Sequence, residues 1–306
     1  MTDAPRSANA ARRARAVERA ATLRGLLWIG PWLVGFAVFL LYPIVMSLIY
    51  SFTDYSILEP PVYVGLENYR DIMTKDATFG RALRNTLVYA AASIPLCTLL
   101  SIALALLLER DTRGARAVRA VVFLPTLVPV SAAAIGWMWL LNGDFGLFNA
   151  ALSAIGLPRP DWLGNPRWAM TSLVIMSLWT VGGATVIYVA ALRDVPTTLY
   201  EAAAIDGITR LGRAWHITLP LISPAILFNT VIALIGSLQV FAAPYVMTRG
   251  GPDFATYFYT MYVYANAFTY ARMGYASALA WIQFLLILMI TAAFFASVRR
   301  RVHYRV

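Results

Sequence analysis

The amino-acid sequence predicts an all-α membrane protein with six membrane-spanning helices. Its 306 residues are 60% hydrophobic and only 13% charged, whereas soluble domains are about 25% charged. The sequence also contains six uncharged runs that are long enough to cross a bilayer. In hydrocarbon such runs form helices, because every peptide group must be hydrogen-bonded within its own segment.

The six uncharged runs follow one another along most of the chain. They cover residues 26–53, 85–108, 120–143, 168–192, 214–248 and 273–298. Prolines lie within them at positions 31, 43, 95, 125, 129, 220, 224 and 244. Membrane helices tolerate proline where neighbouring groups satisfy the freed carbonyls, so we expect kinks and cavities beside these positions.

The net charge of +10 suits either a nucleic-acid binder or a membrane protein with a biased topology, and its distribution decides between them. With the N-terminus inside, 17 of the 25 basic residues fall on the inner face, and the outer face has eight basic and eight acidic residues. We therefore expect both termini in the cytoplasm and no nucleic-acid partner. Residues 1–25 are expected to form a basic cytoplasmic arm, and residues 26–306 the transmembrane domain. The first apolar run is too long for a signal peptide, which ranks below a retained span.

The residue types in the spans weigh against several mechanisms. Proton relays need ionisable groups at membrane depth, and the six runs contain no carboxylate. The phosphate loop of an ATPase needs a lysine, and the single lysine, Lys75, lies in an external loop. One cysteine and two histidines do not form a zinc site. We expect no catalytic residue, no metal and no cofactor in this chain.

A long cytoplasmic loop separates the fourth and fifth runs, at residues 194–216, and Leu199, Ala202, Ala203 and Ile205 give it small and apolar contacts. Thr198 and Glu201 have the spacing of a capping box, and Gly207 suits the left-handed position that ends a helix. The loop therefore predicts a short helix, a glycine turn and a second helix. On physical grounds such a helix would lie on the lipid headgroups or bind a partner protein.

The pattern of this loop resembles the EAA loop of permease subunits in binding-protein-dependent ABC importers. Glu201-Ala202-Ala203 is followed by Asp206-Gly207, and then by Ile217 and Leu219-Pro220. Residues 64–69, 144–149 and 245–252 are similar to segments of the sugar-permease branch, of the maltose and glycerol-3-phosphate type. The chain lacks the extra N-terminal spans and large external insertion of the bacterial maltose example.

The resemblance implies a type I importer permease fold in the bacterial cytoplasmic (inner) membrane, with a cytoplasmic coupling helix between the fourth and fifth spans. Its implied partners are a second homologous permease subunit, two ATP-binding cassette ATPase subunits that bind ATP and Mg, an extracytoplasmic sugar-binding protein, and membrane lipid. The residues implied to couple the chain to the ATPase are Glu201, Ala202, Ala203, Asp206, Gly207, Ile217 and Pro220.

The family also implies a sugar path, formed by the middles of the spans that flank the loop. The candidates here are Trp179, Thr180, Ser237 and Gln239. Small and polar residues in membrane helices also serve as packing contacts, and for Gln239 the alternative is a hydrogen bond to a neighbouring helix. Because the spans are uncharged, a neutral di- or oligosaccharide is the expected cargo.

Two other classes of function compete with an ATP-driven importer. A self-sufficient secondary carrier or channel is weakened by the lack of membrane carboxylates, although sodium sites built from backbone carbonyls would escape this test. A membrane-embedded enzyme or assembly scaffold would need a polar catalytic cluster, and the sequence shows none.

Overall fold

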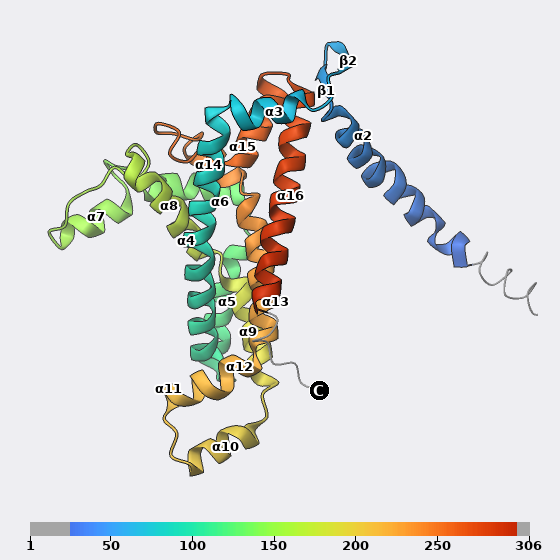
Figure 1. The fold of residues 1–306 in the computed structure, drawn as a ribbon. Coiled ribbons are helices and arrows are strands. Elements are labelled where there is room, and N and C mark those ends of the chain that lie inside the picture. The colour runs from blue at the N-terminus through green and yellow to red at the C-terminus, as the bar shows by residue number, and fades with distance from the viewer. Residues whose placement is uncertain (1–24, 299–306) are drawn as a thin grey trace, which may run out of the picture.

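Apolar helices account for most of the structure, a computed structural model that describes residues 25–298 (Figure 1). Within these residues, four helical segments are long and apolar enough to cross a membrane. They are Gly25–Tyr50, which includes η1 (Ala37–Leu41) and α2 (Tyr42–Tyr50), then α4 (Ala77–Leu108), Ser223–Met247, which comprises α13 (Ser223–Leu238) and α14 (Ala242–Met247), and α16 (Met273–Val298). Residues 1–24 of the predicted basic arm lie outside the described residues, and Gly25 begins the first span.

Two further predicted spans are bent pairs of helices. In the first, α5 (Arg113–Phe123) and η2 (Leu124–Leu127) meet α6 (Val130–Leu140) at 104°. In the second, α8 (Pro166–Trp179) meets α9 (Gly182–Arg193) at 45°. Counting each pair as one span gives six, which matches the prediction.

Proline explains only one of the two bends. Pro129 lies at the first break, as predicted, whereas Pro95 is accommodated inside the continuous helix α4. The second break contains no proline, and α9 begins with Gly182. A Cβ atom at Gly182 would lie 2.1 Å from the carbonyl oxygen of Val122, so the backbones of α9 and α5 are in close contact there.

A set of short elements joins the spans at the end of the bundle that carries α3 (Glu67–Thr74), called here the α3 end (Figure 1). Strands β1 (Thr53–Ser56) and β2 (Glu59–Tyr63) form an antiparallel hairpin. The Asn68 amide donates to the carbonyls of Ser51 and Thr53, which ties α3 to this hairpin. The other short elements are α7 (Leu147–Ala154), α15 (Tyr259–Tyr264) and η4 (Ala265–Thr269).

The α7 segment is organised by one buried amide. Asn149 is 2% exposed, and its Nδ2 donates to the carbonyls of Gly143 and Pro160. Its Oδ1 accepts from the indole nitrogen of Trp162 at 2.8 Å. Asn149, the last residue of the 144–149 segment, therefore holds the two ends of the α7 segment together.

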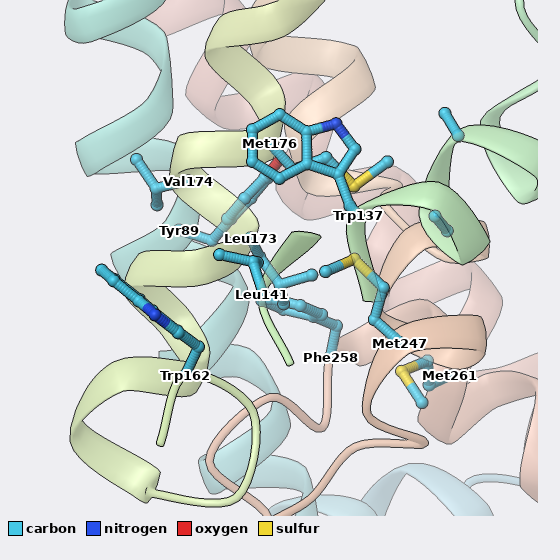
Figure 2. Close-up of a cluster of buried hydrophobic side chains, with 12 residues drawn as sticks. Tyr89, Trp137, Leu141, Trp162, Leu173, Val174, Met176, Met247, Phe258 and Met261 are labelled. Carbon is cyan, nitrogen blue, oxygen red and sulfur yellow. The ribbon is translucent and has the colours of Figure 1, made fainter. Parts of the chain in front are cut away.

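The largest buried cluster lies where α4, α6, α8, α14 and α15 converge with the segment before α15 (Figure 2). Tyr89 of α4 packs edge-on against Phe258, with ring centroids 5.3 Å apart. The labelled members are Tyr89, Trp137, Leu141, Trp162, Leu173, Val174, Met176, Met247, Phe258 and Met261. The cluster fixes α4, α6 and α8 relative to one another where these side chains meet.

The first span diverges from the other helices (Figure 1). Within the part of the chain that the structure describes, none of its most apolar 18-residue window is buried. Only its end at Tyr50 and the following strand pack on α16, where a Cβ atom at Gly274 would lie 2.0 Å from the Thr53 carbonyl oxygen. The rest of the span therefore presents apolar surface on all sides.

Candidate functional site

The predicted loop projects from the end of the bundle opposite α3, called here the α10 end (Figure 1). It contains α10 (Thr197–Ile205), α11 (Arg210–Arg213), the π-helix η3 (Ala214–Thr218) and α12 (Leu219–Leu221). The helix, glycine turn and second helix predicted from the sequence are confirmed.

Gly207 ends α10 in the predicted left-handed conformation. Its φ is +71°, its backbone N–H donates to the Ala204 carbonyl at 3.2 Å, and the Ile208 N–H donates to the Ala203 carbonyl at 2.9 Å. These two bonds form a Schellman motif, which satisfies the last carbonyls of the helix. The chain turns at this point because glycine adopts a positive φ without the steric cost of a Cβ atom.

The predicted capping box is wrong. Helix α10 begins at Thr197, its N-cap is Pro196, and no side chain caps it. Thr198 therefore lies inside the first turn, and Glu201 is exposed and does not cap the helix. Proline at the N-cap explains the shift, because it sets an extended conformation at residue 196, two residues before the N-cap that the capping box requires.

The other predicted coupling residues lie in different environments. Ala202, Asp206 and Gly207 are exposed, whereas Ala203 is 3% exposed and packs within the chain. Ile217 belongs to η3 and Pro220 to α12, and both are half-buried. Ala203 is therefore unavailable for close approach by a partner, while Ala202 remains available.

The sequence indicated an apolar face that includes Ile205, but Leu211 and Trp215, which extend this surface, were not identified. Ile205 is 87% exposed, Leu211 71% and Trp215 64%. Large exposed apolar groups on one projecting segment indicate a contact surface for another molecule. The pattern was readable in the sequence, but exposure depends on the loop standing clear of the bundle.

One hydrogen bond joins α10 to the start of the fifth span. The Tyr200 hydroxyl lies 3.0 Å from Thr218 Oγ1, and Thr218 is 3% exposed. Tyr200 also packs beside the buried cluster that contains Leu192, Val195 and Ile222. This bond and this packing connect α10 with η3 and α12, which lead directly into α13.

A cavity of about 250 Å³ lies between α4, the break between α8 and α9, and α13. Thr180 and Ser237, two of the four predicted sugar-path residues, line it. Its polar lining comprises hydroxyls, one thiol and one amide, and none of its described lining residues is charged: Tyr89, Ser93, Cys97, Thr98, Ser101, Ser177, Thr180, Tyr188, Asn229 and Ser237. The cavity can offer hydrogen bonds without ionic attraction.

Trp179 and Gln239 lie outside the lining of this cavity. The Trp179 ring is edge-on to Trp137, with centroids 6.4 Å apart. Gln239 is exposed at the break between α13 and α14. The interhelical amide bond considered for Gln239 is made by Gln283, whose Nε2 donates to the Leu238 carbonyl and to Thr260 Oγ1, each at 2.9 Å.

The cavity contains an unpaired buried hydroxyl. Tyr188 is completely buried, and its hydroxyl has no hydrogen-bond partner among the described residues. Around it pack Ala105, Val189 and other apolar residues of α4 and α9. Among the described residues, the hydroxyl therefore makes no bond that a substitution would break.

Tyr188→Phe is expected to cost no stability, because it removes a hydroxyl that no described residue bonds and keeps the ring. The measurement is the thermal unfolding midpoint of the purified protein. Tyr259→Phe is the matched control, since Tyr259 is 1% exposed and its hydroxyl donates to the Leu279 carbonyl at 2.9 Å. The control is expected to lose stability, and a loss in both variants would contradict the prediction.

Comparison with known proteins places this geometry in a family. Residues 98–304 match the model of the binding-protein-dependent transport system inner membrane component. YesP of Bacillus subtilis (strain 168) is 34% identical over 301 residues, covering 97% of each chain. The trehalose/maltose transport system permease protein MalF of Thermococcus litoralis is 33% identical over 272 residues, covering 88% of this chain and 92% of that one.

A solved structure shares the whole fold. A permease chain of a bacterial alginate ABC transporter, in complex with an alginate pentasaccharide-bound periplasmic protein, has a TM-score of 0.82 and 26% identity, covering 95% of this chain and 99% of that one. The chain described here belongs to the family of binding-protein-dependent transport system inner membrane components. It is the permease subunit of an ABC transporter, with the type I permease fold, and the predicted family and fold are confirmed.

Proposed function

We propose that this chain forms half of the pore of a sugar importer. A separate ATPase drives transport by binding α10 and moving it. The observation that supports this proposal is the structural connection between the loop and the cavity. Exposed apolar groups on the loop offer a contact, the bond between Tyr200 and Thr218 transmits movement, and α13 lines the cavity. In this proposal both termini and α10 lie in the cytoplasm, and ATP and Mg bind to the partner.

Reconstitution tests the proposal. The chain would be purified with its partner permease, its two ATPase subunits and its binding protein, and placed in liposomes. Sugar uptake is expected only with ATP and the binding protein present. Uptake by this chain alone would overturn the proposal and favour a self-sufficient carrier.

The chemistry of the cavity supports a neutral di- or oligosaccharide as cargo. Hydroxyl and amide groups bind sugar hydroxyls, and the described lining offers no charge to hold a uronate or a phosphate. Thr180 and Ser237 are the proposed contacts within it, and Trp179 and Gln239 are proposed contacts outside it. Competition of labelled uptake by neutral and acidic disaccharides distinguishes these cargo classes.

Cys97, the single cysteine, provides a direct test of the cavity. Its Sγ lies 3.5 Å from Ser177 Oγ on the cavity wall. A small methanethiosulfonate reagent is expected to block uptake, and saturating sugar during treatment is expected to slow the block. Cys97→Ser is the control for cysteines in the partner subunits. A block that sugar does not slow would count against this cavity as the sugar path.

The divergent first span supports a second permease subunit as partner. Trp28 is 88% exposed and Phe39 83%, on a helix that the other described residues leave uncovered. A photoreactive residue at Phe39 is expected to crosslink to the partner permease in the assembled transporter. The same probe at Ile287, which is 9% exposed within this chain, is the control. Crosslinking of Phe39 to lipid alone would contradict the prediction.

A further inference from the structure

An arginine cluster lies where α4, α5 and α9 meet at the α10 end. One carboxylate, Asp111, faces three guanidinium groups, with Oδ1 at 3.3 Å from Arg119 Nη2, 3.3 Å from Arg193 Nη2 and 3.7 Å from Arg116 Nε. Desolvation acts to raise the pKa of Asp111, but the arginines outweigh it and lower the pKa below its usual value. Even with Asp111 ionised, the three arginines leave the cluster positively charged.

The three arginines differ in their burial and in the number of bonds that they make in this network. Arg119 is mostly buried, and it also donates to the carbonyls of Ala115 and Arg110. Arg193 makes its bond to Asp111 at the end of α9. The Arg116 side chain is 61% exposed, and its contact with Asp111 is the longest of the three. Arg116 is therefore the guanidinium most available to another anion.

A groove of about 300 Å³ begins at these arginines. Its described lining is Arg116, Arg119, Ala120, Phe123 and Val186. The first four residues lie on one face of α5 at helical spacing, and Val186 faces them from α9. The groove is cationic at the end near the helix boundary and apolar toward the middle of the span.

We propose that this groove binds an anionic phospholipid, with its phosphate on Arg116 and Arg119 and an acyl chain along Ala120, Phe123 and Val186. A lipid is the expected occupant because basic residues are followed by apolar residues along the groove. Basic residues lie where α4 ends and α5 begins, and apolar residues follow along the span, which is the polarity of a lipid in one leaflet. A soluble anion would match the arginines but would leave Phe123 and Val186 uncovered.

The test uses the assembled transporter in detergent micelles and measures bound lipid by native mass spectrometry. Phosphatidylglycerol is added in competition with phosphatidylcholine. We expect wild-type protein to retain phosphatidylglycerol preferentially and Arg116→Gln to retain at least fivefold less. Arg113→Gln is the matched control, because it removes one charge from the same helix at a residue outside the groove lining. Equal retention of the two lipids, or an equal loss in both variants, would overturn the proposal.

Two further measurements keep the proposal testable. Millimolar inorganic phosphate is expected to leave the bound lipid in place, and complete displacement would indicate a simple anion site instead of a lipid site. Photoactivatable phosphatidylglycerol is expected to label residues 113–123 of the wild-type protein. Labelling that avoids this segment would overturn the proposal even if Arg116→Gln failed to fold.

Discussion

Gly207→Val is expected to reduce ATP-driven uptake at least about tenfold while the protein still inserts and assembles. The φ of +71° at this position is strained for a β-branched residue, and the strain costs about 1–2 kcal/mol. A Cβ atom there meets nothing within 4 Å, so the effect comes from the backbone and not from a clash. The strain would break the Schellman motif and misplace the end of α10. The measurement is uptake in proteoliposomes beside ATPase activity.

Gly156 provides a matched control for this substitution. It ends α7, which projects from the side of the bundle away from the coupling loop (Figure 1), with a φ of +73°, and it has the same two hydrogen bonds, from Gly156 to Ser153 and from Leu157 to Leu152. Gly156→Val imposes equal strain far from the coupling loop, so its uptake should exceed that of Gly207→Val. Gly207→Asn should retain most uptake, since asparagine tolerates this conformation. Equal uptake in the two valine variants would contradict a specific role for Gly207.

The sequence predicted the number and order of the spans because hydrocarbon imposes a simple rule of length and polarity. The positions of charged residues predicted the ends of the helices less accurately than the number of spans. Helix α4 extends back to Ala77, through Arg81 and Arg84, and α5 begins at Arg113, since a helix continues beyond the apolar layer when its polar side chains reach water. The 45° break before Gly182 was missed because it depends on contact with α5 and not on a proline.

The coupling loop was predicted more completely than the cavity. A glycine turn is a local property of the chain, so the sequence placed Gly207 correctly, whereas the exact start of α10 depended on Pro196. The cavity is built from three helices distant in the sequence. Residue type alone could not show that Thr180 and Ser237 face it while Gln239 does not, or that Tyr188 would be buried without a partner.

Gly182→Ala is expected to destabilise the protein by about 1–3 kcal/mol or more, because the added methyl group overpacks a contact between two backbones. The new Cβ atom would lie 2.1 Å from the Val122 carbonyl oxygen and 2.8 Å from Phe123 Cα, so α5 and α9 must separate. That separation would also widen the groove beside Val186 and distort the cavity at Thr180. The measurement is the thermal unfolding midpoint, with uptake as a second readout.

Gly183→Ala is the control, one residue further along the same helix. Its Cβ atom would meet only Thr126 Cγ2, at 3.9 Å, which is ordinary contact. Alanine is favoured over glycine inside a helix by about 0.5–1 kcal/mol, so without a clash the substitution should be neutral or stabilising. The two neighbours are therefore expected to shift the midpoint in opposite directions. A downward shift of similar size in both would show that the α9 helix start, and not its contact with α5, requires glycine.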